Sequence, residues 1–268
     1  MSGLPVPPRP EPVEGPCRIG ARRSRASTSS ARAVLGCLAL SLITFAQPAI
    51  AQSATPEERL AQVRHRVERL EDHDAIELLQ ASYGYYFDKG LWGEVAALFS
   101  RNGRFEYGQR GIYIGRERIA RALLLFGPER LAPGYLNNHM QLQAVITVAD
   151  DGRTATARWQ GMVMLSQPGA NGQWGVGIYE NEYVKEGGVW KIASLHFYLV
   201  GMTDYDLGWT RSAIPMEGPS ALFPPDEPPS EVYRAFPSNY VPPFSYPHPV
   251  TGRPIELVQP ADDVVGRE

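Results

Sequence analysis

Residues 139–200 read HMQLQAVITVADDGRTATARWQGMVMLSQPGANGQWGVGIYENEYVKEGGVWKIASLHFYLV, and they contain four long candidate strands. We expect these strands over residues 139–148, 154–166, 174–185 and 189–200. Turn-forming residues separate them: Asp150-Asp151-Gly152, Asn171-Gly172 and Glu186-Gly187-Gly188. Such short, glycine-containing connections are typical of hairpins. The stretch therefore predicts an antiparallel meander.

Helical patterns precede the meander. Thr55-Pro56-Glu57-Glu58 combines an N-cap, a proline at the first helical position and a glutamate three residues after the cap. Apolar residues then recur at helical spacing, and Asp72 or Asp74 is expected to cap a second helical stretch that Gly90 ends. Shorter elements follow: a helix over 92–99, a turn at Asn102-Gly103, strands over 104–108 and 112–114, and a helix over 117–126. Helices followed by a meander predict an α+β fold.

The first 51 residues have the composition of a targeting segment. Six arginines precede an apolar run from Ala33 to Phe45, and Pro48-Ala49-Ile50-Ala51 follows it. A basic region, a short apolar core and a small-x-small end are typical of a secretory signal peptide. The run is shorter than the roughly 20 residues that a membrane span requires. We expect cleavage after Ala51, an exported periplasmic or secreted protein, and no stable membrane insertion.

Cleavage would change the charge and the thiol content of the chain. The whole chain has a net charge of −3, with 26 Lys+Arg and 29 Asp+Glu, and the leader carries six Arg and two Glu. The mature protein is therefore acidic, at about −7, which argues against nucleic-acid binding. Both cysteines, Cys17 and Cys37, lie in the leader. The exported chain would have neither disulfides nor cysteine ligands for a metal.

The mature chain divides into a domain over residues 52–208 and an extension over residues 209–268. Thirteen of the 24 prolines lie between Pro215 and Pro260. Aromatic residues are interleaved with them, whereas disordered tails are usually poor in aromatics. We expect an extended, proline-rich segment that wraps the domain or a neighbouring subunit.

Several short motifs of the domain resemble one family. They are Asp74-Ala75-Ile76, residues 83–92, Leu98-Phe99, residues 111–116, Asn138-His139 and residues 187–192. Their order and spacing are similar to those of a SnoaL-like domain of the NTF2-like superfamily. The resemblance implies a cone in which a curved antiparallel sheet packs on N-terminal helices and encloses an apolar pocket. Similar members include scytalone dehydratase, bile-acid dehydratase, ketosteroid isomerase and formaldehyde lyases of diaryl compounds. Because other members only bind or assemble, the fold does not fix the function.

The resemblance also implies catalytic residues. In the dehydratases of the superfamily, a carboxylate of the first helix pairs with a histidine of an early long strand, and Asp88 and His139 match those positions. A carboxylate that accepts one imidazole N–H leaves the other nitrogen free to move a proton. Tyr83 is expected to donate a hydrogen bond to a developing oxyanion. His196 is expected to act as a second acid or base, because this chain lacks the arginine that relatives carry near that position.

Further residues complete the expected site. Tyr198 shares a strand face with His196 if the alternation of the last strand is regular. We also place Tyr86, Asn138 and Trp159 among the substrate-binding residues. The histidines of the chain show no metal-ligand spacing, and no glycine-rich phosphate loop follows a strand. We therefore expect no metal and no organic cofactor.

These observations favour a cofactor-independent lyase of the dehydratase type, with His139 taking a proton beside the leaving group. Its substrate would be a hydrophobic, oxygenated aromatic or polycyclic small molecule, as in aromatic compound catabolism. Loss of formaldehyde and isomerisation need the same groups and remain open. The alternative from another class is a periplasmic binding or assembly module without catalysis. A homodimer or homotrimer is expected, because the open face of such a sheet is usually buried against another subunit.

Overall fold

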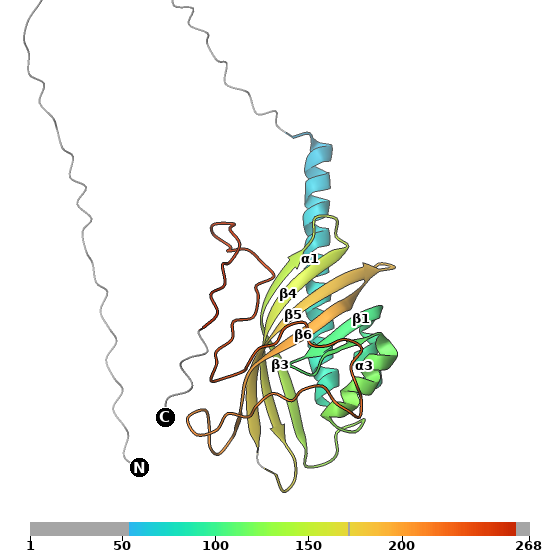
Figure 1. Cartoon of the computed structure of the whole chain (residues 1–268). Coiled ribbons are helices and arrows are strands. Elements are labelled where there is room, and N and C mark those ends of the chain that lie inside the picture. The colour runs from blue at the N-terminus through green and yellow to red at the C-terminus, as the bar shows by residue number, and fades with distance from the viewer. Residues whose placement is uncertain (1–53, 171, 261–268) are drawn as a thin grey trace, which may run out of the picture. The chain divides into compact units, whose positions relative to one another are not determined.

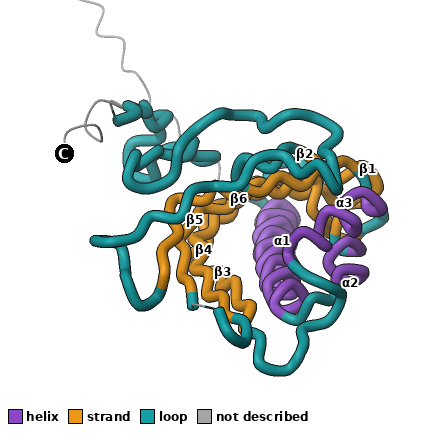
Figure 2. Tube along the Cα trace, turned by 60° about the horizontal axis from the view of Figure 1, so that its bottom comes forward, coloured by secondary structure: helices purple, strands orange, loops and turns teal. Residues whose placement is uncertain are grey.

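The computed structural model describes residues 54–170 and 172–260 (Figure 1). The predicted leader, residues 1–51, and Asn171 of one predicted turn lie outside the described residues. A long helix, α1, runs along the concave side of a six-stranded sheet, and the sheet curves around it (Figure 2). None of the helices within the described ranges combines the length and apolar character of a membrane span.

Helix α1 spans Pro56–Asp88 as one continuous helix rather than the two stretches predicted from the sequence. The predicted capping box is present: the Thr55 side chain accepts from the Glu58 amide, and the Glu58 carboxylate accepts from the Thr55 amide at 2.7 Å. Asp72 caps nothing, because it is buried and accepts hydrogen bonds from Lys185 and Trp190. The start of α1 projects beyond the sheet (Figure 1), Arg69 donates to the carbonyl of Val148 at the end of β3 at 2.6 Å, and the buried residues of the helix begin at Asp72.

The sheet has the strand order β2-β1-β6-β5-β4-β3. Its strands are β1 (Phe99–Tyr107), β2 (Ile112–Ile114), β3 (Leu136–Val148), β4 (Thr154–Ser166), β5 (Gln173–Glu186) and β6 (Val189–Asp204). Strands β3 to β6 form the predicted antiparallel meander. The expectation of a wholly antiparallel sheet is wrong for one pair, because β1 runs parallel to β6. No hairpin joins these two strands, so their relative direction is not fixed by a tight turn.

Two short helices lie beside α1. They are α2 (Trp92–Ala97) and α3 (Arg116–Leu123), and a 3-10 turn over Leu124–Phe126 extends α3. Phe99 and Asn102-Gly103 belong to β1 instead of the predicted helix and turn. The pairing of β1 with β6 shifts between Phe99 and Arg104, so the strand takes up extra residues as an irregularity. Gly103 fits there because a Cβ would lie 2.9 Å from that of Phe99.

The proline-rich segment after β6 lies along the sheet in Figure 2. Its Glu227 forms a bridge with Ile112 of β2 and an ion pair with Arg104 at 2.6 Å. Further along, the carbonyl of Pro243 accepts a hydrogen bond from Arg158 of β4 at 2.8 Å. Tyr233 and Ala235 of the segment are buried. We call residues 209–260 the extension below.

Candidate active site

A cavity of about 810 Å³ opens at one end of the curved sheet. Gly90 and Trp92, which follow α1, and the loop over residues 127–135 form one side, and the ends of β1, β3, β4 and β6 form the other. Residues 214–217 of the extension close part of the wall. The volume lies in the range of about 300–1,000 Å³ that is usual for small-molecule sites. Its wall includes the aromatic and charged side chains of Trp92, Tyr107, Arg110, Phe126, His139 and Glu217.

Asp88 and His139 meet beside this cavity. Asp88 is the last residue of α1, and His139 lies on β3, which packs against that helix. The Asp88 Oδ1 atom accepts a hydrogen bond from the backbone amide of His139 at 2.6 Å and lies 3.8 Å from the ring Nδ1. The carboxylate therefore fixes the strand backbone, and the ring is near it without a hydrogen bond. His139 lines the cavity and is 3% exposed.

Burial sets the charge of both groups. It lowers the pKa of His139 to about 3, so the ring is neutral near pH 7. It also raises the pKa of Asp88, against which the His139 amide and the charge of Lys89 act. Nδ1 is buried and has no hydrogen-bond partner among the described residues. Because Nδ1 is on the Asp88 side, Nε2 is the nitrogen left for a molecule in the cavity. Burial alone makes this neutral imidazole a weak base, and the Asp88 carboxylate, 3.8 Å from Nδ1, is the group placed to stabilise the cation when Nε2 accepts a proton.

Tyr83 lies deeper than the cavity wall. It is fully buried on α1, its ring centroid lies 6.0 Å from that of Tyr179, and neither hydroxyl has a partner among the described residues. Burial, with Tyr179 as the next cause, raises the pKa of Tyr83 well above its ordinary value. The hydroxyl therefore stays protonated near neutral pH and keeps a proton to donate. Tyr83 is not among the residues that line the cavity, so its expected contact with substrate remains a prediction.

Residues 68–196 match the family of the SnoaL-like domain. The matched residues run from α1 to His196 on β6 and include both Asp88 and His139. The chain contains a SnoaL-like domain. Helices packed on a curved, unclosed sheet together with this match confirm the predicted α+β fold of the NTF2-like type.

Solved structures with a similar arrangement include two from Novosphingobium aromaticivorans. One, provisionally named a scytalone dehydratase, is 22% identical, with 58% of this chain and 97% of that chain covered and a TM-score of 0.46. The other, an NTF2-like protein with a cystatin-like fold, is 24% identical, with 53% and 90% covered and a TM-score of 0.43. The hexachlorocyclohexane dehydrochlorinase LinA type 2 is 21% identical, with 52% and 92% covered and a TM-score of 0.45. The activities in these names belong to those proteins. No curated protein matches the chain.

Asn137, and not the predicted Asn138, faces the cavity of the SnoaL-like domain. Side chains of a strand alternate between its two faces, so Asn137 shares the inner face with His139, and Asn138 faces the other way. The buried Asn137 amide donates to the carbonyl of Phe87 at 3.1 Å. This hydrogen bond ties the start of β3 to the end of α1 next to Asp88. The predicted placement of Asn138 in the site is wrong by one residue.

His196 and Tyr198 lie on the opposite face of the sheet, under the extension. The Nδ1 atom of His196 lies 3.5 Å from Glu106, whose carboxylate accepts hydrogen bonds from Ser230. Tyr198 stacks on His196 and on Tyr240 of the extension. The expected roles of His196 and Tyr198 in the cavity therefore do not fit their positions.

An irregularity in β6 explains this difference. On β5, Glu182 pairs with Ser194 and Tyr183 pairs with Ile192, so Ala193 is an extra residue. Such a bulge reverses the alternation of side chains. Ile192 is consequently in the core, whereas Ser194, His196 and Tyr198 point to the opposite face, where the extension covers His196 and Tyr198. The prediction assumed a regular strand and placed all of them on one face.

Tyr86 and Trp159 pack in the core and are not among the cavity-lining residues. Tyr86 is half-buried on α1. The indole of Trp159 donates to the hydroxyl of Tyr183 at 3.1 Å, and that hydroxyl donates to Gln80 at 2.8 Å. The buried hydrogen-bond network to Gln80 fixes Trp159 as a structural residue. The prediction of these two residues as substrate contacts is not supported by their positions.

Sequence reasoning missed Tyr107, Arg110 and Phe126, which line the cavity. Tyr107 ends β1, and Arg110 follows it in a turn that the amide of Arg110 closes onto the Tyr107 carbonyl at 3.2 Å. The turn itself was predictable from Gly108 and Gly111, but the side on which its arginine lies was not. Phe126 packs edge-on against Tyr107 at a centroid distance of 4.7 Å.

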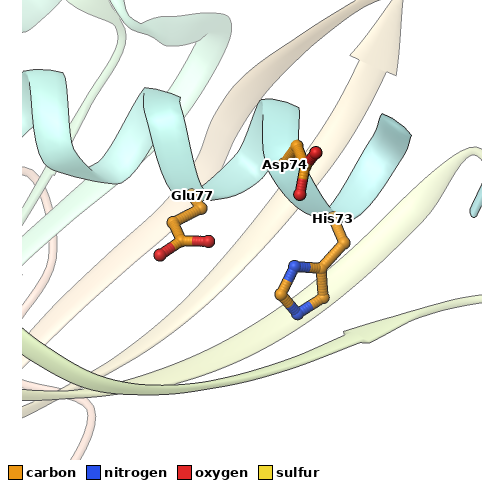
Figure 3. A group of neighbouring side chains, drawn as sticks. All are labelled: His73, Asp74 and Glu77. Carbon is orange, nitrogen blue, oxygen red and sulfur yellow. The ribbon is translucent and has the colours of Figure 1, made fainter. Parts of the chain in front are cut away.

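His73, Asp74 and Glu77 form a group in which three ligand-type side chains approach one another on α1 (Figure 3). Helical periodicity alone brings residues at these spacings together. Asp74 and Glu77 are exposed, His73 is half-buried, and among the described residues no buried polar atom points to an ion bound there. This group therefore does not argue for a metal centre, and the expectation of metal-independent chemistry remains a prediction.

The buried His196 predicts a pH dependence of stability. Burial lowers its pKa to about 3, whereas an unfolded histidine has a pKa of about 6.5. The unfolded chain therefore binds more protons between these values, and the free energy of unfolding falls as the pH drops from about 6.5 toward 3. We expect His196→Gln to flatten this dependence in urea titrations at several pH values. The exposed His65→Gln is the control, and equal slopes for wild type and His196→Gln would contradict the prediction.

Proposed function

We propose that the protein is a cofactor-independent lyase that moves a proton with His139 and Asp88. The observation that carries this proposal is a neutral, buried imidazole on the wall of an 810 Å³ cavity, with a carboxylate oxygen 3.8 Å from its inner nitrogen. The family match supports it, because SnoaL-like domains include cofactor-independent lyases and isomerases. The same pair of His139 and Asp88 argues against a module that only binds or assembles, because such a module needs no acid–base pair in its cavity.

The proposed substrate is a small hydrophobic, oxygenated aromatic or polycyclic molecule. Trp92, Tyr107 and Phe126 contribute aromatic surface to the cavity. Aromatic walls give a flat ligand a large contact area at low conformational cost. The cavity volume accommodates a molecule of a few rings.

Dehydration is the proposed reaction. His139 takes a proton from the carbon adjacent to the one that bears the leaving oxygen, a C=C bond forms between these two carbons, and the C–O bond breaks. The imidazolium then gives its proton to the departing oxygen, so that water leaves and the histidine returns to its neutral state. Proton transfer of this kind by a positioned side chain contributes about 10²–10⁴-fold to a rate.

Two related reactions use the same pair and are outcomes of the test. His139 can take the O–H proton of a hydroxymethyl group, so that the C–C bond breaks and formaldehyde leaves. The electrons of that bond then form a C=C bond and expel a neighbouring hydroxyl, which takes the proton from the imidazolium and leaves as water. Return of the proton to a different carbon gives an isomer. The leader further supports the proposal that the enzyme acts outside the cytoplasm, and the family resemblance supports a homodimer or homotrimer.

The proposal predicts turnover without any added cofactor. Purified full chain would be incubated in EDTA with diaryl propanediols, aromatic β-hydroxy ketones and a Δ5-3-ketosteroid. Mass spectrometry then separates loss of water, loss of formaldehyde and an isomer of unchanged mass. We expect one of these products with wild type and none with His139→Gln. If His139→Gln retains the activity found, the proposed mechanism is wrong.

A further inference from the structure

Arg110 lies at the cavity and is the more buried partner of an ion pair with Glu217. Its side chain is 15% exposed, and its guanidinium lies 5.4 Å from the centroid of Phe126. Both residues line the same cavity as His139. The turn after β1 and the aromatic ring thus hold the cation in place beside the proposed active site. Nothing in the proposed dehydration requires a guanidinium there.

The partner of Arg110 comes from the extension. The carboxylate of Glu217 accepts a hydrogen bond from Nη2 of Arg110, and the Glu217 side chain is 72% exposed. Within residues 54–170 and 172–260, Nε and Nη1 of Arg110 donate no hydrogen bond, and neither atom is buried without a partner. Those donors therefore remain accessible to water or a ligand. The planar fork of an arginine suits a carboxylate, which it can bind with two parallel hydrogen bonds.

The other charges on the cavity wall are placed differently. Arg130 is exposed, and Asp204 is held by the Ser212 hydroxyl at 2.8 Å. Among the described lining residues, Arg110 is therefore the cation that is shielded from solvent and still has free donors. An ion pair gains strength as water is excluded. A ligand that covers Arg110 would therefore bind best if it carries a negative charge that pairs with the guanidinium.

We propose that the cavity binds hydrophobic carboxylates, with Arg110 pairing with the ligand carboxylate and Glu217 acting as the counterion that the ligand displaces. This inference names the substrate class of the proposed active site, rests on that proposed function, and concerns binding rather than the chemical step. A single guanidinium beside aromatic side chains fits one carboxylate on an apolar body. The exposed position of Glu217 favours its replacement by the ligand carboxylate, because water solvates the Glu217 carboxylate readily when it leaves Arg110.

The test compares two probes of similar shape, 2-naphthoate and 2-naphthalenemethanol, by isothermal titration calorimetry on the full chain. We expect the carboxylate to bind wild type more tightly than the alcohol. Arg110→Gln should weaken naphthoate binding about 10-fold or more and leave the alcohol within about 2-fold. Equal affinities of wild type for the two probes, no detectable binding of either, or an equal loss for both probes in Arg110→Gln would overturn the proposal.

The role of Glu217 needs a matched control, because its loss also removes a contact of the extension. Glu217→Gln should tighten naphthoate binding about 3-fold or more, since a competing carboxylate is gone. Glu227→Gln breaks another ion pair of the extension, with Arg104, at a site outside the cavity. It should leave naphthoate affinity unchanged. If Glu217→Gln fails to tighten binding, Glu217 is a tether and not a competitor.

Failure of this inference and failure of the proposed function are distinguishable. His139→Gln is expected to retain the Arg110-dependent preference for naphthoate while losing turnover. If turnover depends on His139 but binding shows no carboxylate preference, only the substrate class is wrong. If the preference is present but His139→Gln turns over normally, only the proposed catalytic role is wrong.

Discussion

Replacement of His139 by glutamine is expected to lower kcat by about 10²–10⁴-fold on the substrate that the assay identifies. Glutamine keeps a polar side chain of similar reach but cannot accept and return a proton near neutral pH. His139 is a neutral imidazole on the cavity wall, so its replacement removes the proposed proton transfer while leaving the cavity in place. Steady-state kinetics and a thermal unfolding curve of the same preparation would separate chemistry from folding.

Asp88→Asn is the companion variant. The asparagine Oδ1 can still accept from the His139 amide, so the strand stays fixed, but the charge that would stabilise the imidazolium is gone. We expect a kcat loss in the same direction with folding retained. His196→Gln is the matched control, because this histidine lies on the other face of the sheet, and kcat should stay within about 2-fold. Full activity in both the His139 and the Asp88 variants would disprove the mechanism.

Replacement of Gly177 by alanine is expected to destabilise the domain by about 3 kcal/mol. Gly177 lies on β5 under the ring of Phe197, which a Cβ would overlap, and the Cβ would also lie 2.7 Å from the Tyr198 carbonyl oxygen. The ring cannot simply move away, because Tyr107 and Tyr179 pack on it at 4.6 and 4.5 Å between centroids. The same substitution would therefore also displace Tyr107 from the cavity wall.

Urea denaturation of Gly177→Ala measures this effect directly. Gly93→Ala is the control, because Gly93 lies on α2, where an added Cβ would meet no described atom within 4 Å and the backbone has no positive φ. Alanine there should stabilise the domain by about 0.5–1 kcal/mol through its higher helix propensity. An unfolding midpoint of Gly177→Ala equal to that of wild type would show that the strand accommodates the methyl group.

The pairing of Asp88 with His139 could be predicted from the sequence, and the details of that pairing could not. The end of a helix and the first residues of a long strand are visible as patterns, and the family resemblance aligned them. Which atom the Asp88 carboxylate contacts depends on how α1 packs on β3. In this packing the backbone amide of His139, and not its ring, donates the hydrogen bond. The exchange of Asn138 for Asn137 has a similar origin, because a shift by one residue reverses the face of a strand.

The sequence by itself determined the elements and their order: the capped first helix, the meander with its turns, and the α+β class. These depend on local periodicity, capping and turn residues, which act over a few positions. Only the tertiary structure decided that an extra residue at Ala193 turns His196 and Tyr198 away from the cavity. It also decided that Glu217, far along the chain, reaches Arg110. Bulges and contacts between distant segments depend on the pairing and packing of the whole sheet, and no short stretch of sequence encodes them.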